Sequence, residues 1–329
     1  MHPAVTVLLH RRTDLDVRDW HAVWDDLAAN QLDRDDALIL LASVSGALPG
    51  VATLQALLTS FAERRPPPPP VWPGSVNIVG TGGGPATFNI STAAACAAAA
   101  IGVPVIKSGS RAYTSRLGSV DLLEHLGIRQ AGSYQETTEM LGRHGIAFVG
   151  GFVYPAEVGR LARLVLPVGL KPFGRIFNTL GPLLAALPVS SQVSGVSDPA
   201  VLPLLRELTG VVPRQILWCV NAAGADELLP FAANAVHTRE RVTLLGPSTG
   251  GSVEELRPDG DPVRQFLDVV SGEGTATATT TVAWNAAALA TAADPELDWD
   301  DSVDRAVDAL KSGAVRDLVL RIGRRAGGG

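Results

Sequence analysis

The sequence is poor in cysteine, since its 329 residues include only Cys96 and Cys219. Both lie in apolar stretches, so we expect two buried, reduced thiols and no disulfide framework. The cysteines and histidines also show none of the spacings of a Cys/His metal site. Metal chemistry based on thiolate or imidazole ligands is therefore not expected.

The sequence also lacks a hydrophobic run long enough to cross a membrane. The alanine-rich run from Thr92 to Val105 is apolar, but it has about 14 residues where a membrane helix needs roughly 20. The N-terminal segment, MHPAVTVLLHRRTD, lacks the apolar core and cleavage site of a signal peptide. We expect a cytoplasmic protein without membrane contact.

There is no excess of basic residues. Lysine and arginine together number 27 against 33 acidic residues, which gives a net charge of −6. Proteins that bind nucleic acids usually carry a basic stripe, so this balance disfavours nucleic acid as a partner. Hydrophobic residues make up 46% and charged residues 18%, which is typical of a globular chain.

The first 64 residues predict a small bundle of short helices. Asp16 is a candidate cap for a helix whose apolar residues Trp20, Val23, Trp24 and Leu27 recur at helical spacing. Two further helices are expected from near Asp33 to about Ser45 and from about Val51 to Arg64. The proline-rich segment 64–74 then predicts a stiff, extended boundary.

After this boundary, strands alternate with helices, which is typical of an α/β domain with a mainly parallel sheet. We expect strands over 76–79, 103–107, 145–149, 192–196 and 215–220, and two closing helices over 296–323. The fold class is therefore α/β, with a small helical N-terminal domain and a larger α/β domain. We place the helical domain at 1–66, with a later helical contribution near 155–185, and the α/β domain at 67–329.

A glycine run between a strand and a helix is the first feature that indicates chemistry. Gly80-Thr81-Gly82-Gly83-Gly84 lets the backbone approach an anion, and Asn89-Ile90-Ser91-Thr92 opens a helix whose N-terminus favours negative charge. The run matches neither the dinucleotide-binding nor the P-loop pattern. The alternative is a plain strand-to-helix turn with Asn89 or Ser91 as the N-cap.

Basic and small residues follow the next strand, in Lys107-Ser108-Gly109-Ser110-Arg111 and in Arg116-Leu117-Gly118-Ser119. α/β folds bind ligands at such strand ends. Lys107 is placed to neutralise a phosphate, and Ser119 either caps the next helix or binds the same anion. The alternative is a solvated basic loop.

Two further segments carry polar groups. Asp226 and Glu227 follow a strand and form a candidate magnesium site, because Mg²⁺ takes a few carboxylates together with waters and phosphates. The alternative is a helix N-terminus with favourably placed acids. Arg175 and Asn178 are three residues apart and would share a helix face toward a cleft, unless Arg175 forms a structural salt bridge.

In their order along the chain, these segments resemble anthranilate phosphoribosyltransferase. The matching motifs are GTGG, NIST, KxGxR, GSxDLLexLG, RIFNTLGPL and GxDEL. The resemblance implies an architecture shared with nucleoside phosphorylases and a homodimer formed through the helical domain. It also implies transfer of the phosphoribosyl group of phosphoribosyl pyrophosphate (PRPP) to the amine of anthranilate, with release of pyrophosphate, as in tryptophan biosynthesis.

The resemblance assigns residues to the donor and the metal, and it assigns no catalytic residue. It implies that Asp226 and Glu227 hold Mg²⁺. It implies that the donor is bound by Gly80, Gly82, Gly83, Asn89, Ser91, Thr92, Lys107 and Ser119.

Most departures from the family lie on the acceptor side. Ser108 and Ser110 replace the histidine and asparagine of the family motif, and Gly174 stands where the family has the arginine that receives the anthranilate carboxylate. The stretch around Pro155 lacks the family's histidine, and the acid of the family's glycine run is either replaced at Gly84 or deleted. The expected acceptor residues are Ser110, Arg160, Arg175 and Asn178, with Arg160 or Arg175 supplying the missing charge.

Several functions therefore stay open at this point. The first is the anthranilate enzyme itself, and the second is the same donor chemistry on another aromatic acid or amine. A pyrimidine nucleoside phosphorylase is disfavoured by Asp226-Glu227 and by the RIFNTLGPL segment. A non-catalytic relative that binds nucleic acid is disfavoured by the charge of −6.

Overall fold

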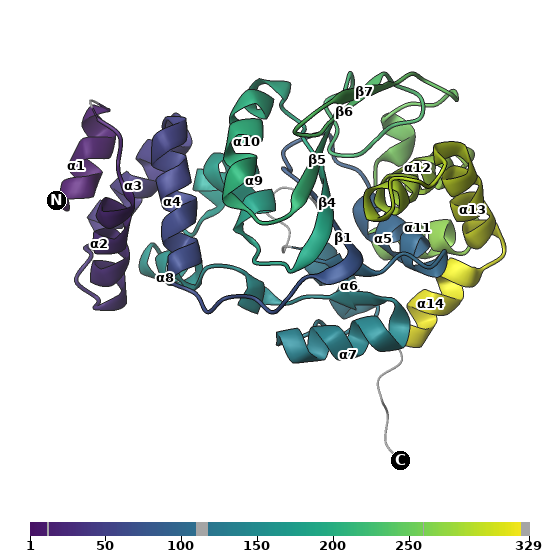
Figure 1. Cartoon of the computed structure of the whole chain (residues 1–329), viewed down its shortest axis with the longest axis horizontal. Coiled ribbons are helices and arrows are strands. Elements are labelled where there is room, and N and C mark those ends of the chain that lie inside the picture. Colours follow the sequence, from purple (N-terminus) through teal and green to yellow (C-terminus); the bar gives the residue numbers. More distant parts are fainter. Residues whose placement is uncertain (12, 110–117, 259, 324–329) are drawn as a thin grey trace, which may run out of the picture. The chain divides into compact units, whose positions relative to one another are not determined.

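The computed structural model describes residues 1–11, 13–109, 118–258 and 260–323. The chain divides into two compact units. Figure 1 labels helices and strands of both units. The first comprises Met1–Pro68, Phe152–Ala186 and Pro203–Pro213. The second comprises Pro69–Gly151, Leu187–Leu202 and Arg214–Gly329.

The first unit is helical. Its α-helices are α1 (Pro3–His10), α2 (Val17–Ala28), α3 (Arg34–Gly46), α4 (Val51–Glu63), α8 (Ala156–Leu164), α9 (Gly174–Leu184) and most of α10 (Leu202–Leu208). Helices α2, α3 and α4 confirm the three that the sequence predicts, whereas α1 is an addition. Helix α1 begins at Pro3, and the His2 side chain accepts a hydrogen bond from the backbone N–H of Ala4.

Asp16 caps α2 as expected. Its Oδ1 accepts from the backbone N–H groups of Arg18 and Asp19, and the Asp19 carboxylate accepts from the backbone of Asp16. This reciprocal capping box satisfies N–H groups that have no partner inside the helix. The apolar face of α2 is buried, with Trp20 and Trp24 stacked at a centroid distance of 5.5 Å.

The second unit is built on a seven-stranded sheet in the order β3-β2-β1-β4-β5-β6-β7. The first five in this order are parallel, and β6 and β7 are antiparallel. Their bounds are β1 Trp72–Gly80, β2 Val105–Lys107, β3 Ile146–Phe148, β4 Val189–Gly195, β5 Gln215–Asn221, β6 Asn234–His237 and β7 Val242–Leu245. The expected mainly parallel sheet is confirmed.

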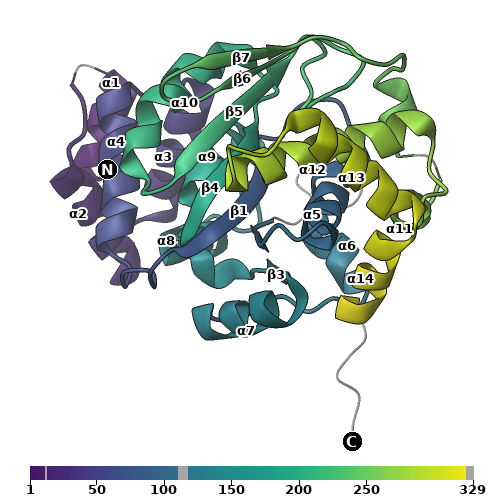
Figure 2. The same ribbon diagram turned by 45° about the vertical axis from the view of Figure 1, so that its right-hand side comes forward.

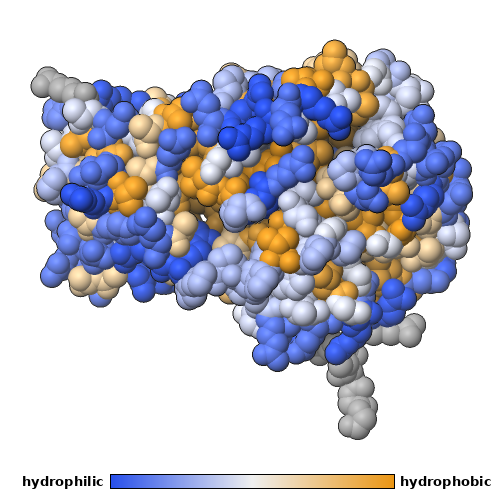
Figure 3. Space-filling model, in the orientation of Figure 1, coloured by the Kyte–Doolittle hydropathy of each residue, from blue (hydrophilic) through white to orange (hydrophobic). Residues whose placement is uncertain are grey.

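The β6–β7 hairpin was not expected from the sequence, because β7 is largely exposed and gives no buried apolar run. Leu244 is 77% exposed and Val242 is 48% exposed. Figure 3 shows hydrophobic residues at the surface among hydrophilic ones in this region.

Helices α5 (Ile90–Ala100) and α12 (Ala276–Ala293) pack side by side on one face of the sheet (Figure 1 and Figure 2). Their alanines allow this close approach, and most of them are buried. The other α-helices of this unit are α6 (Ser119–His125), α7 (Tyr134–His144), α11 (Pro262–Val270), α13 (Trp299–Lys311) and α14 (Ala314–Gly323).

The alanine-rich run is therefore part of a packed core. Within the described part of the chain, no helix is long and apolar enough to span a bilayer. Cys96 on α5 and Cys219 on β5 are both buried and free, as expected. Burial raises the pKa of each thiol to about 12, which keeps the thiols protonated.

Candidate active site

The carboxyl ends of four neighbouring strands bring the predicted donor and metal residues together. In the order β2-β1-β4-β5, these ends carry Lys107, Gly80, Ser197 and Asp226. The strand order reverses between β1 and β4, because β1 leads to β2 on one side and β4 leads to β5 on the other. Open α/β sheets bind ligands at such a switch point.

Glycine is required in the run after β1 for two separate reasons. Gly82 and Gly83 have φ angles of 70° and 87°, which side chains other than glycine rarely adopt. Gly80 has a different role, since a Cβ there would lie 2.7 Å from the Cβ of Asp226. Gly80 pairs with Gly195 across β1 and β4, and both glycines leave room for Asp226.

Two hydroxyl groups that were not assigned from the sequence hold this loop. Thr81 Oγ1 donates to Asp226 Oδ1 at 3.2 Å, and it accepts from the backbone N–H of Ser197 at 3.2 Å. Ser197 Oγ donates to the carbonyl of Gly82 at 2.7 Å. Thr81 lies inside the glycine run and Ser197 follows a predicted buried strand. The sequence signal that could have identified both residues is a hydroxyl side chain just after a predicted strand.

Asp226 and Glu227 lie in a loop held by Asn221. The Asn221 side-chain amide donates to the carbonyls of Ala225 and Glu227 at 2.9 Å and 2.7 Å. No helix begins at these acids, so the alternative of a helix N-terminus is wrong. Thr87 Oγ1 donates to Glu227 Oε1 at 3.2 Å.

Burial and mutual repulsion change the protonation of the two neighbouring carboxyl groups. Burial raises the pKa of Asp226 above its usual range, while hydrogen bonds from Thr81, Gly82 and Ser197 act in the opposite direction. Burial also raises the pKa of Glu227, and the neighbouring charge of Asp226 raises it further. Two carboxylates in one partly buried place repel each other unless a cation or a proton is present.

Lys107 brings a positive charge to these strand ends. Its side chain is buried, and Nζ donates to the carbonyl of Ile78 at 3.0 Å and to that of Ser108 at 3.4 Å. Burial lowers the pKa of Lys107 to about 8, whereas Cys96 and Glu227 act to raise it. The alternative of a solvated basic loop is therefore wrong for Lys107. Arg111 and Arg116 lie outside the described residues.

The N-terminus of α5 adds hydroxyl groups. Asn89 occupies the N-cap position but makes no side-chain capping bond, and Ser91 lies inside the helix. Thr92 Oγ1 is buried and finds no hydrogen-bond partner among the described residues. Buried hydroxyls are normally paired, so this atom is suited to accept or donate to a bound group.

Ser119 lies in the first turn of α6, and Gly118 takes the N-cap position in its place. A Cβ on Gly109 would collide with the Ser119 hydroxyl, so the chain after β2 passes directly beside Ser119. Ser110, one of the expected acceptor residues, lies outside the described residues.

The other expected acceptor residues belong to the helical unit. Arg160 is an exposed residue of α8. Arg175 on α9 is also exposed, and its Nη1 donates to the carbonyl of Gly46 at 3.2 Å. Arg175 has no ion-pair partner among the described residues, so the alternative of a structural salt bridge is not found there. Asn178 is half-buried on α9.

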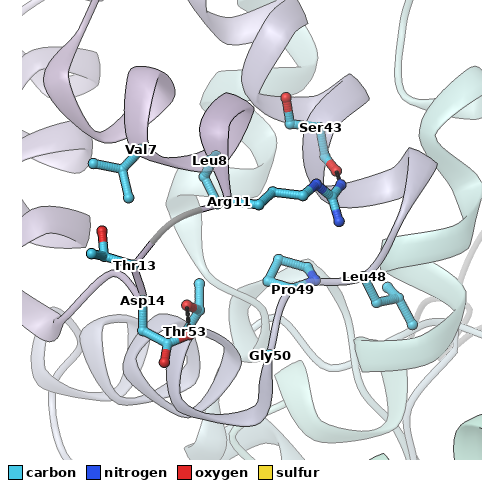
Figure 4. Close-up of a pocket in the computed structure, with 10 residues that line it drawn as sticks. All are labelled: Val7, Leu8, Arg11, Thr13, Asp14, Ser43, Leu48, Pro49, Gly50 and Thr53. Carbon is cyan, nitrogen blue, oxygen red and sulfur yellow. Dashed lines mark hydrogen bonds between the residues drawn. The ribbon is translucent and has the colours of Figure 1, made fainter.

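The helical unit also contains a hollow of about 220 Å³, shown in Figure 4. Arg11 Nη2 donates to the carbonyls of Ser43 and Ala47, and Thr53 donates to Asp14. None of the residues expected to bind substrate or metal lines this hollow.

The comparisons with known proteins agree with the geometry. A family described as "Glycosyl transferase family, a/b domain" matches residues 73–316. The chain belongs to this glycosyltransferase family. Within it, anthranilate phosphoribosyltransferase from Methylorubrum extorquens (strain PA1) is 36% identical over 263 residues, 76% of this chain and 76% of that protein. The enzyme from Prochlorococcus marinus (strain NATL2A) is 33% identical over 247 residues, 71% of each chain.

Solved structures of this glycosyltransferase family share the fold. Anthranilate phosphoribosyltransferase from Thermus thermophilus superposes with a TM-score of 0.82 at 28% identity, covering 98% of both chains. The Saccharomyces cerevisiae enzyme in complex with PRPP and Mg has the same fold, with a TM-score of 0.78 at 22% identity over 96% of this chain and 94% of that one. The chain is therefore an anthranilate phosphoribosyltransferase-like enzyme.

Proposed function

We propose that this enzyme transfers the 5-phosphoribosyl group of PRPP to the amine of an aromatic acid, releasing pyrophosphate, with anthranilate as the first candidate acceptor. The observation that carries the proposal is the convergence of Lys107, Asp226 and Glu227 at one switch point of the sheet. A buried cation beside two carboxylates suits a magnesium pyrophosphate group. The relatives named above support anthranilate as the acceptor, and a role in tryptophan biosynthesis is part of the proposal.

The donor would lie against the glycine run and the start of α5. The left-handed turn at Gly82 and Gly83 brings backbone close to the ligand, as successive amides do in anion-binding loops. The Thr92 hydroxyl lacks a partner among the described residues, and the helix N-terminus favours negative charge. We assign donor binding to Gly80, Gly82, Gly83, Asn89, Ser91, Thr92, Lys107 and Ser119, with Gly80 acting by making room for Asp226.

The side chains present fit Mg²⁺. Asp226 and Glu227 provide two carboxylates whose raised pKa values reflect burial and, for Glu227, the nearby charge of Asp226. Among the described residues no closed cage of three or more metal ligands exists. Mg²⁺ is commonly bound by one or two carboxylates together with waters and substrate phosphates. Bound there, the ion would neutralise charge on the pyrophosphate.

The chain's own groups then support the bond exchange. The amine lone pair forms the new C–N bond at the anomeric carbon of the ribose. The C–O bond breaks with its electron pair moving to pyrophosphate, and the amine later loses a proton. Because the ribose gains oxocarbenium character and the leaving group gains charge, Lys107 and the loop amides stabilise the departing side. The acceptor needs mainly to be held in line.

An alternative acceptor, another aromatic acid or amine, is favoured by Gly174, because no side chain is present at the position of the family's carboxylate-binding arginine. A bidentate arginine contact depends strongly on position. We assign acceptor binding to Ser110, Arg160, Arg175 and Asn178.

The test is pyrophosphate release from PRPP and Mg²⁺ across a panel of aromatic acids and amines. Efficient turnover of anthranilate would exclude the altered acceptor, and turnover confined to another aromatic compound would exclude anthranilate. No release with any acceptor would contradict the transferase. A Lys107→Ala variant checks that release depends on the donor site.

Two rarer functions have separate readouts in the same assay series. Phosphorolysis of pyrimidine nucleosides with orthophosphate would identify a nucleoside phosphorylase. A salt-sensitive shift of DNA would identify a nucleic-acid binder, which the charge of −6 disfavours. We further propose that the enzyme acts in the cytoplasm as a homodimer formed through its helical domain.

A further inference from the structure

Strands β1 and β2 separate toward the donor site. They pair only at Val76 and Val105, whereas β1 continues to pair with β4 as far as Gly80 and Gly195. Strand β2 in turn pairs with β3 through Lys107. Between β1 and the end of β2, no regular ladder of main-chain bonds therefore fixes the spacing near Lys107.

The Asn77 side chain spans this gap. Its Oδ1 accepts from the backbone N–H of Ser108 at 3.1 Å, where a ladder partner would otherwise stand. Its Nδ2 lies 3.3 Å from Ser108 Oγ and donates to Gln192 Oε1 at 3.0 Å. Asn77 is fully buried and Ser108 is nearly so, which shields these bonds from water.

Asn77 is itself held from the other side. Gln192 Oε1 on β4 also accepts from Arg214 Nε at 2.9 Å, and Gln192 Nε2 donates to Ser194 Oγ at 2.8 Å. A buried network of side-chain hydrogen bonds therefore extends from Arg214, just before β5, through β4 and β1 to the end of β2. Within such a network, each amide orientation is fixed by the donors and acceptors around it.

This hydrogen-bond network ends beside the two carbonyl groups that accept from Lys107. Lys107 Nζ donates to the carbonyls of Ile78 and Ser108. Ile78 follows Asn77 in the sequence, and the Ser108 backbone N–H donates to Asn77 Oδ1. We propose that Asn77 is a positioning residue that sets the distance between these carbonyls and so aims Lys107 at the pyrophosphate of the donor. This inference rests on the proposed donor site.

The experiment compares three variants of the full chain with the wild type. Asn77→Ala removes the bridge, and Asn77→Asp keeps the acceptor for the Ser108 N–H but loses the donor to Gln192 Oε1. Ser191→Ala is the matched control, because it removes a different buried bond on β4, from Ser191 Oγ to the carbonyl of Ala292 at 2.6 Å. The readouts are the Kd of PRPP with Mg²⁺ by calorimetry, the separate KM values for PRPP and acceptor, and thermal unfolding.

We expect Asn77→Ala to raise the Kd and KM of PRPP by about tenfold, while the KM of the acceptor changes less than about twofold; tenfold corresponds to about 1.4 kcal/mol. Asn77→Asp should recover only part of the PRPP affinity, because it keeps the bond from Ser108 and loses the bond to Gln192. Ser191→Ala should lose thermal stability but keep PRPP affinity.

Two results would overturn the inference. One is PRPP affinity in Asn77→Ala equal to that of the Ser191→Ala control. The other is an equal rise in both KM values, which would indicate a general structural role. Failure of the wild type to bind PRPP would instead contradict the proposed function, so the two failures are distinguishable.

Discussion

At the level of single residues, Lys107 shows how burial changes the meaning of a sequence motif. The motif around it contains basic and small residues and is compatible with a solvated loop. In the structure its ammonium group is buried and donates to two carbonyls, with the charge of Glu227 nearby. A buried cation costs desolvation energy, so its presence favours a functional role.

We predict that Lys107→Met reduces PRPP-dependent pyrophosphate release by at least about 100-fold, since removing a single group that stabilises developing charge costs this much in other enzymes. The apolar side chain removes a buried charge, so thermal unfolding should change by only a few degrees. The matched control is Lys311→Met at the exposed end of α13. Release within about twofold of wild type in Lys107→Met would remove this residue from the donor site.

The carboxyl pair predicts a pH dependence of stability. The pKa of Asp226 and that of Glu227 are raised in the folded protein, so without metal the folded state binds more protons than the unfolded state. The free energy of unfolding should therefore fall as the pH rises from about 6 to about 8. The lowered pKa of Lys107 acts only above about 8 and leaves this window unchanged.

The measurement is the Tm in chelator at both ends of this window. Glu227→Gln should flatten the dependence, because its amide does not titrate. Adding Mg²⁺ should raise the Tm of the wild type more at the higher pH, since the ion competes with protons for the carboxylates. A wild-type Tm that rises with pH in chelator would contradict the assignment.

At the level of elements, the loops after β1, β4 and β5 are packed so closely that they act as one unit. A Cβ on Gly84 would lie 2.7 Å from the carbonyl oxygen of Gly224 and 3.0 Å from the Cβ of Ser197. The acid that the family carries in this run therefore has no room at position 84 unless the loops move.

We predict that Gly84→Asp does not increase activity and lowers PRPP affinity at least about fivefold, because overpacking displaces neighbouring backbone. Gly142→Ala is the control, because Gly142 lies in helix α7 and a Cβ there would have no other atom within 4 Å. It should keep activity and gain up to about 1 kcal/mol of stability. Improved turnover in Gly84→Asp would show that the loops adapt freely.

Helix capping in the helical unit gives a second prediction at this level. Asp16→Ala removes the capping box of α2 and should cost about 1 kcal/mol, which lowers the Tm by roughly 2 °C. Asp33 occupies the N-cap position of α3 without a side-chain capping bond, so Asp33→Ala should change the Tm much less. Equal losses in both variants would show that the cap bonds do not account for the difference.

At the level of the complete chain, a helical unit and an α/β unit carry different parts of the expected chemistry. The expected donor and metal residues that the structure describes lie in the α/β unit, and Arg160, Arg175 and Asn178 lie in the helical unit. The domain boundary at residue 66 stays a prediction. The roles of the donor, metal and acceptor residues also stay predictions.

The proposed homodimer predicts a mass of about twice 34.3 kDa in light scattering at micromolar concentration. The mass should stay unchanged with or without PRPP, because the helical domain is proposed to form the interface. A mass of one chain across the concentration range would contradict the dimer. Residues of α1 to α4 that become protected from exchange on dimerisation would locate the interface.

Local periodicity and turn residues were enough to predict the α/β class and three helices of the N-terminal bundle, whereas the donor-site residues were assigned through the resemblance to the family. Periodicity and turn residues did not predict α1 or the β6–β7 hairpin, since the exposed strand β7 gives no apolar pattern. Thr81, Ser197 and Asn77 were recognised as bonded to the site residues from the folded chain alone, as was the approach of Gly84 to Gly224. These contacts join strands far apart in the chain, so their distances are set by sheet register and packing and leave no local trace in the sequence.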